Sequence, residues 1–221
     1  MNRTSSSLLF AAALSAAATP LPCFAAVLVG NLDQPPRDVT GIPTVLGWAA
    51  QSFVTGASGE LLSAIDVLVG QRDGSPAIVA ELRADSAFGP GALLSGFSVP
   101  LLPAGTPQPV SLTPSIAWAL APDTTYWLVL GTTGAGSFGW SYAQGNVTTG
   151  PGALASYAYS QDQGVSWNSF GTDNPYQMQV DVSAVPEPAT AQALLLGLLC
   201  VGGLKYWLRR AAADGSSAMG K

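Results

Sequence analysis

Short apolar runs, separated by glycine, proline, serine and aspartate, restrict the central part of this chain, residues 26–185, to a β fold. No stretch there keeps a helical apolar period of 3.6 residues for long. The runs have the length and alternation of strands, and the breaks hold turn-forming residues. We expect strands over Val27–Asn31, Leu46–Thr55, Leu61–Gly70, Ile78–Arg83, Phe97–Val99, Val110–Leu112, Thr124–Thr132, Ser137–Ala143, Leu154–Ser160 and Tyr176–Ser183.

Two of these runs indicate how the strands are arranged. Thr124–Thr132 is apolar on both faces, which predicts a central strand that is covered on each side. Tyr176–Ser183 alternates with period two and predicts Met178, Val180 and Val182 pointing inward. We therefore expect an all-β domain: an antiparallel β-sandwich, jelly-roll-like in topology.

Two of the breaks have specific sequence signals. Leu32–Pro43 contains Pro35, Pro36 and Pro43, and proline lacks the backbone donor that a central strand needs. The segment is predicted to be an irregular loop outside any central strand. Asp73-Gly74 predicts a hairpin turn, because both residues tolerate a positive φ.

The first 25 residues have the pattern of a cleaved secretory signal peptide. Arg3 supplies the positive start, Leu8–Ala18 is apolar, and Cys23-Phe24-Ala25 precedes a cleavage point before Ala26. The alternative is an N-terminal anchor that is retained uncut.

Residues 186–210 combine a Pro-Glu-Pro triplet, an apolar segment and a basic end. The triplet is Pro186, Glu187 and Pro188, and the apolar segment runs from Ala189 to Leu204. This segment predicts a single transmembrane helix, although it is shorter than the ~20 residues of a typical span. The basic end consists of Lys205, Arg209 and Arg210. By the positive-inside rule, these cations place residues 211–221 in the cytoplasm as a short tail.

Charge and residue usage exclude several classes of function for the domain at residues 26–185. It has eleven acidic residues and three arginines, a balance of −8 that does not suit nucleic acid binding. The whole chain has no histidine, which excludes Ser-His-Asp triads and His-ligated metal sites. Both cysteines, Cys23 and Cys200, lie outside the domain, so the domain has no disulfide. We expect no cofactor.

The C-terminal pattern resembles the PEP-CTERM sorting signal of Gram-negative bacteria. The resemblance rests on the ordered set of Pro186-Glu187-Pro188, the apolar span and the arginine-containing end. It implies recognition by an exosortase-type membrane enzyme that removes the tail as the protein moves to the cell surface or matrix. Members of the family usually stop a few residues after the arginines, whereas this chain continues through Ala211–Lys221. The alternative is a plain C-terminal membrane anchor.

The domain itself is similar to the "choice-of-anchor" ectodomains, most of all type R. The similarity lies in Gln51-Ser52-Phe53, in Leu120–Leu130, and in Tyr159–Trp167 followed by a closing strand. It supports the expected fold and surface location, and it implies no enzymatic activity.

Ser160–Trp167, with the sequence S-Q-D-Q-G-V-S-W, is similar to an Asp-box. In such a hairpin Asp162 accepts hydrogen bonds from turn amides, Gly164 supplies a permissive backbone, and Trp167 packs beneath the turn. We expect a structural turn; contact with a cation or a sugar is the alternative.

The aromatic residues cluster late in the chain. Period two places Trp140 and Tyr142 on one strand face, and Tyr157 and Tyr159 on another. Together with Trp167 these residues form a candidate platform for stacking on sugar rings. The alternative is that they form the core, since sequence does not tell which face is exposed to water.

These observations lead to three hypotheses of function. The first is an exported, non-enzymatic protein of the cell surface or extracellular matrix, transiently anchored by its C-terminal helix and processed by an exosortase. The second is a carbohydrate-binding module that engages extracellular polysaccharide. The third is a hydrolase, but the eleven acids offer no pair that can be placed face to face.

Overall fold

The computed structural model describes residues 25–43 and 47–184, which form thirteen strands and no helix. Each ladder between two of these strands is antiparallel, so the expected all-β, antiparallel class is confirmed. The strands are β1 Ala26–Gly30, β2 Pro36–Pro43, β3 Trp48–Val54, β4 Glu60–Gly74, β5 Ile78–Ser86, β6 Gly89–Ser98, β7 Gln108–Pro114, β8 Trp118–Leu120, β9 Thr125–Thr132, β10 Gly136–Ala143, β11 Ala153–Ser160, β12 Asn168–Phe170 and β13 Met178–Ala184.

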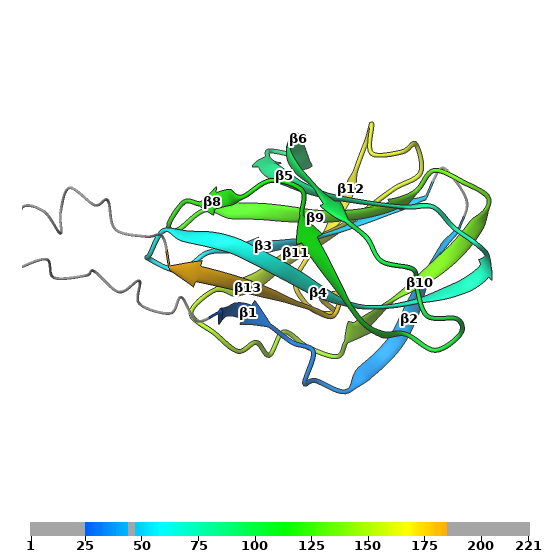
Figure 1. Ribbon diagram of the computed structural model, residues 1–221, viewed down its shortest axis with the longest axis horizontal. Coiled ribbons are helices and arrows are strands. Elements are labelled where there is room, and N and C mark those ends of the chain that lie inside the picture. The colour runs from blue at the N-terminus through cyan, green and yellow to red at the C-terminus, as the bar shows by residue number, and fades with distance from the viewer. Residues whose placement is uncertain (1–24, 44–46, 185–221) are drawn as a thin grey trace, which may run out of the picture.

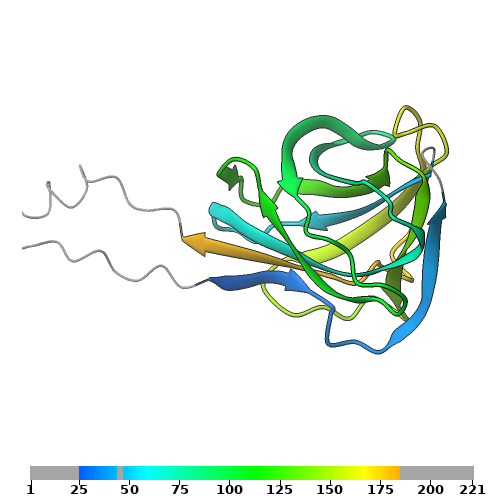
Figure 2. The ribbon, with the colours of Figure 1, turned by 45° about the vertical axis from the view of Figure 1, so that its right-hand side comes forward.

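The strands form a strongly curled sheet that folds into two layers, as Figure 1 and Figure 2 show. Its order is β1-β13-β4-β7-β6-β5-β9-β3-β11-β12, with β10 joining β4 to β2 and β8 pairing with β4. Among the described strands, the sheet is continuous between the layers only through β6 and β7, which share two residue pairs, Phe97↔Pro114 and Ser98↔Thr113. The architecture is therefore β-sandwich-like.

The core lies between the two layers and follows the period-two pattern of the sequence. On β13, Met178, Val180 and Val182 are buried, as predicted. β9 lies between β3 and β5, and both of its faces are buried. Its inner residues Leu128 and Leu130 join the main core, so the prediction of a central strand covered on each side is confirmed.

Two predictions about the breaks are wrong. Pro36–Pro43 is strand β2, at an edge, because its prolines stand at the two ends and the residues between them pair with β10. Gly74 does have a positive φ of 64°. It does not close a hairpin, because the end of β4 pairs with β10 while β5 pairs with β6 and β9 in the other layer.

Besides β2, two short strands are missing from the sequence prediction, and β6 is much longer than predicted. β6 begins at Gly89 rather than at Phe97, because its Gly-Pro-Gly start resembles a turn. β8 and β12 have three residues each, which is too short for alternation to reveal them.

A β-bulge in β11 determines which way its tyrosines point. Leu154 pairs with Phe53 but Tyr157 pairs with Gln51, so β11 contains one extra residue. This shift turns Tyr157 to the inner face that Leu154 also occupies. The Gln51 amide donates to the bulge carbonyls of Ala155 (3.3 Å) and Ser156 (3.2 Å), and the Ser52 hydroxyl also donates to the Ser156 carbonyl (2.8 Å).

The irregular segment before β13, residues 174–177, is held by buried side-chain amides. Gln51 Oε1 accepts from the Tyr176 amide (2.9 Å), and Asn31 Oδ1 accepts from the Met178 amide (2.8 Å). The Gln177 side chain accepts from Ser141 Oγ (2.7 Å) and donates to the Gln34 carbonyl (2.7 Å). Residues from both layers thus satisfy the polar groups of this segment.

Within the described ranges no helix is long and apolar enough to cross a membrane. The expected signal peptide, the expected transmembrane helix and the expected cytoplasmic tail lie outside the described residues.

Replacing Gln51 by leucine is expected to destabilise the domain by several kcal/mol. The change leaves the Tyr176 amide and the Ala155 carbonyl without their partner, at about 1–3 kcal/mol for each buried group, while the Ser156 carbonyl keeps the Ser52 hydroxyl as a donor. Urea unfolding measures the loss. Gln108→Leu, an exposed change on β7, is the matched control and should stay within ~0.5 kcal/mol of the wild type. Equal stability of the two variants would contradict the proposed role of the Gln51 amide.

Candidate functional site

The five aromatic residues predicted to form a ligand platform lie in different environments. Trp140 is in the core, with an exposed fraction of 0%. Its ring stacks on Tyr176 with 4.5 Å between centroids, and its Nε1 donates to the Gln177 carbonyl (3.0 Å). A fully buried ring cannot stack on a ligand, so the prediction of Trp140 as a platform residue is wrong.

Tyr142 and Tyr157 meet in a surface depression, which we call the tyrosine recess. It has a cavity volume of about 250 Å³. Strands β2, β10 and β11 and the segment before β13 contribute its lining, so both layers of the sandwich take part. The lining residues are Arg37, Thr40, Tyr142, Tyr157, Asn174 and Tyr176.

Tyr176 forms the most deeply buried part of this recess. Burial raises the pKa of Tyr176 to about 12, and a hydrogen bond with Thr40 opposes this rise. The nearby phenols of Tyr157, Tyr159 and Tyr142 also raise the pKa. The Tyr176 hydroxyl therefore stays protonated at neutral pH.

Arg37 and Asn174 form a polar rim at the recess. Arg37 Nη1 donates to Asn174 Oδ1 at 2.6 Å. The ion pair found in the described part of the chain joins Arg83 to Glu81, so Arg37 has a neutral protein partner there. The hydrogen bond links β2 to the segment before β13 and orients both side chains.

Tyr159 and Trp167 lie apart from the recess lining. Tyr159 is partly buried against the main core, on the same face of β11 as Tyr157. Trp167 packs on the opposite, outer face of the second layer, against an apolar outer cluster formed by Trp48, Ala50, Trp127, Val129 and Ala158. The structure thus brings together Tyr142 and Tyr157 and does not unite all five residues.

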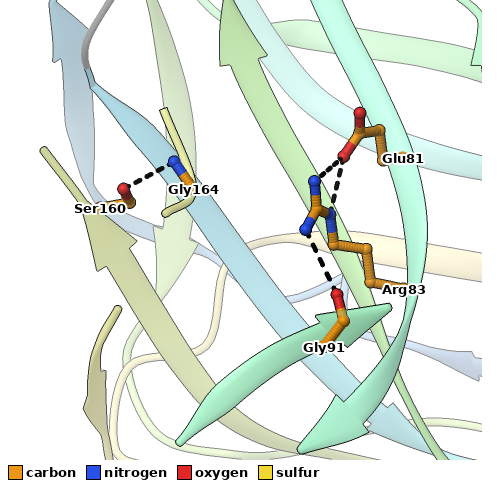
Figure 3. A network of polar contacts seen from close by, with 5 residues as sticks. All are labelled: Glu81, Arg83, Gly91, Ser160 and Gly164. Carbon is orange, nitrogen blue, oxygen red and sulfur yellow. Dashed lines mark hydrogen bonds and ion pairs between the residues drawn. The ribbon is translucent and has the colours of Figure 1, made fainter. Parts of the chain in front are cut away.

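The outer cluster depends on a close approach at Gly131. A Cβ atom at Gly131 would lie 2.4 Å from the Trp48 ring, so only glycine leaves room for this indole. Arg83 lies 6.0 Å from the centroid of the same ring. Its guanidinium is held by Glu81 at 2.7 Å and by the Gly91 carbonyl at 3.2 Å (Figure 3).

The Asp-box segment forms the loop of the β11–β12 hairpin. Asp162 Oδ1 accepts from the Ser166 amide (2.9 Å), and Oδ2 accepts from the Ser166 hydroxyl (2.5 Å). The Ser160 hydroxyl donates to Asp162 (2.7 Å) and accepts from the Gly164 amide (2.8 Å; Figure 3). These bonds, first of all that from the Ser166 hydroxyl, lower the pKa of Asp162 from 3.8 to about 2.

Gly164 lets this loop lie against the outer cluster. Its φ of 80° suits glycine, and a Cβ there would come within 3.0 Å of Trp48 and 3.2 Å of Trp167. Both Asp162 carboxylate oxygens therefore face hydrogen-bond donors of the loop itself, and Gly164 faces the indole rings.

Two other depressions differ from the tyrosine recess in chemistry. The larger has about 700 Å³ and is lined by glycines, Gln71, Arg72, Asp73 and Ser137, without an aromatic ring. The other, about 350 Å³, lies beside the Asp-box hairpin and includes Asp85, Trp127 and Trp167. There Trp127 Nε1 donates to Asp85 (2.7 Å), and the Trp127 side chain is buried.

Acidic residues do not gather into a metal-binding group within residues 25–43 and 47–184. One carboxylate, that of Asp181, is influenced by another. Burial, and to a smaller extent Asp66, raises the pKa of Asp181, while a hydrogen bond from Gln179 opposes the rise. Neither carboxylate lines one of the three depressions described above.

Sequence patterns do not single out the polar half of the recess. Arg37 and Thr40 lie in the proline-containing segment that predicts a loop, and Asn174 lies in an irregular stretch. The one feature of the sequence that could have pointed to this site is the charge of Arg37, which is one of three cations in an acidic domain.

The predicted sorting residues Pro186, Glu187, Pro188, Lys205, Arg209 and Arg210 lie outside the described residues. No protein-family model matches the chain, and no curated protein matches it either.

Asp162→Asn is expected to lower the melting temperature at pH 7. The folded-state pKa lies below the ordinary value of 3.8, so the ionised group stabilises the fold above about pH 4. This stabilisation is lost as the pH falls toward 2. The difference in melting temperature between variant and wild type should therefore shrink over that range.

Asp33→Asn, an exposed change in the loop after β1, is the control and should melt like the wild type throughout. A difference between Asp162→Asn and the wild type that stays constant from pH 7 to pH 2 would refute the role of the charge.

Proposed function

We propose that this chain is an exported, non-enzymatic protein of the cell surface or extracellular matrix, sorted through its C-terminal PEP-CTERM-like segment. The observation that supports this proposal is where the fold begins and ends. β1 starts at Ala26, directly after the expected signal peptide, and β13 ends at Ala184, just before the Pro-Glu-Pro triplet. Removal of either segment therefore cuts none of the strands in the described part of the chain.

The two boundaries also lie together in space. Ala26 pairs with Val182, so β1 begins and β13 ends at the same end of the sandwich (Figure 1). A domain attached in this way would be held at one end. Its opposite end, which β4 reaches at Gly74, would point away from the membrane.

The tyrosine recess lies beside the start of β13, away from the attached end. Tyr176 precedes β13 by two residues, whereas the sorting segment follows the end of β13. A seven-residue strand spans about 20 Å. A ligand in the recess would thus be kept clear of the membrane surface before processing.

We also propose that the domain is a jelly-roll-like sandwich similar to the choice-of-anchor ectodomains. The two antiparallel layers and the shared core support it. The non-enzymatic character rests on residue usage, since a chain without histidine lacks the most common catalytic base. An exosortase-type enzyme is the proposed processing partner.

A second candidate function is carbohydrate binding. The observation that favours it is the tyrosine recess, where rings and polar groups meet on one surface. Export and glycan binding are compatible, because a protein of the matrix is surrounded by extracellular polysaccharide.

Replacing Pro186, Glu187 and Pro188 by alanine is expected to leave the full chain in the inner membrane at its unprocessed size. The reason is that the proposed enzyme would no longer recognise its substrate. Immunoblots of membrane and extracellular fractions, from a host with a matching exosortase, measure the outcome. Ser216→Ala with Ser217→Ala is the control in the same tail and should be processed normally. Normal processing of the triple variant would show that the sorting proposal is wrong.

A further inference from the structure

We propose that the tyrosine recess binds one uncharged sugar ring of an extracellular glycan. This inference deepens the second candidate function and rests on it. Four features of the recess lead to it: fixed aromatic rings, hydroxyls without protein partners, a size suited to one ring, and a local charge that disfavours acidic sugars.

The aromatic rings at the recess are fixed before any ligand arrives. Tyr157 stacks on Phe170 at 5.1 Å and meets Tyr176 edge-on at 5.9 Å. Tyr176 in turn stacks on the buried Trp140. Rings held in this way lose little conformational entropy on binding, and their faces suit the C–H groups of a sugar.

Polar groups around these rings are available for sugar hydroxyls. The Tyr142 and Tyr157 hydroxyls form no hydrogen bond with the described part of the protein. The bond between Arg37 and Asn174 uses Asn174 Oδ1 and one guanidinium nitrogen, and leaves the Asn174 amide nitrogen and the other guanidinium N–H groups. The recess thus offers donors from all four residues and acceptors from the two phenols, as a sugar hydroxyl requires.

The dimensions fit a single ring better than a long chain segment. A volume of about 250 Å³ is below the ~300–1,000 Å³ of pockets that hold drug-sized ligands. Phe170, stacked beside Tyr157, is 49% exposed and extends the aromatic surface past the recess. A second sugar unit could contact this ring while the first occupies the recess.

Local charge favours an uncharged sugar over a uronic acid. Arg37 is followed by Asp38, and Asn174 is preceded by Asp173, both exposed acids. The domain around them has eleven acids against three arginines, a field that repels anionic polymers. One guanidinium with two neighbouring carboxylates does not provide a net positive site.

The two other depressions described above lack this combination, and so does a further one of about 280 Å³, which is lined by Val39, Arg72, Thr106, Pro107 and glycines. The largest has no aromatic ring. In the one beside the Asp-box hairpin, Trp127 is only 3% exposed, and the Ser86 and Ser169 hydroxyls donate to the loop carbonyls of Gly89 and Phe88. These two hydroxyls are thus committed to the protein, and Trp167 Nε1 is buried without a partner among the described residues.

The test is a titration of the full chain, purified in a detergent without a sugar headgroup. The probes are neutral disaccharides of glucose, galactose, mannose and N-acetylglucosamine, and the disaccharide of galacturonic acid. Calorimetry should detect binding of at least one neutral probe and weaker binding of the acidic one. Tyr142→Phe and Tyr157→Phe remove only a hydroxyl, and each should weaken binding about three- to tenfold.

Two further variants make the experiment decisive. Tyr159→Phe makes the same chemical change on β11 outside the recess lining and should bind like the wild type. Arg37→Gln changes an exposed residue, so it should fold normally and weaken binding. Thermal melting of each variant shows whether a loss of binding is a loss of folding.

The possible outcomes distinguish a wrong location for the binding site from the absence of carbohydrate binding. Binding of none of the probes, or preference for the acidic probe, overturns the proposal. Neutral sugar binding that Tyr142→Phe, Tyr157→Phe and Arg37→Gln all leave unchanged overturns the site, while carbohydrate binding itself would stand. Export and processing are measured separately and are unaffected by these results.

Discussion

The buried amide network around residues 174–177 is the interaction on which the arrangement of the recess depends. An irregular segment between two layers exposes backbone groups that no ladder satisfies, and each buried unpaired group is costly. Gln51 from one layer and Asn31 from beside the other bind the backbone on either side of Gln177. The segment can therefore lie between the two layers, and this position brings Tyr176 and Asn174 to the recess.

Gln51 links this network to the shape of β11. The same side chain that accepts from the Tyr176 amide also donates to the bulge carbonyls at Ala155 and Ser156. The bulge turns Tyr157 inward, where its ring meets Tyr176. A single buried glutamine thus holds both the segment that carries Tyr176 and the bulge that orients Tyr157. The positions of these two tyrosines in the recess therefore depend on each other.

The sequence was informative where one face of a strand is uniformly apolar. β13 could be predicted because burial of one face imposes period two on its residues, and β9 because burial of both faces makes its whole run apolar. The bulge in β11 could not, since one extra residue leaves no compositional signal and reverses the face of every later side chain. The candidate platform failed at Trp140 for a related reason: a pattern shows that Trp140 and Tyr142 share a face, but not that this face is the interior.

The polar half of the recess was beyond sequence reasoning because it depends on contacts between distant segments. Arg37 and Asn174 are 137 positions apart, and neither belongs to a motif. The proposed mode of binding has a consequence for affinity. One sugar ring offers few contacts against the entropic cost of association, so each recess should bind weakly. Many copies held in one matrix would act on a repeating glycan together, and the effective concentration of neighbouring sites would then supply retention that no single recess provides.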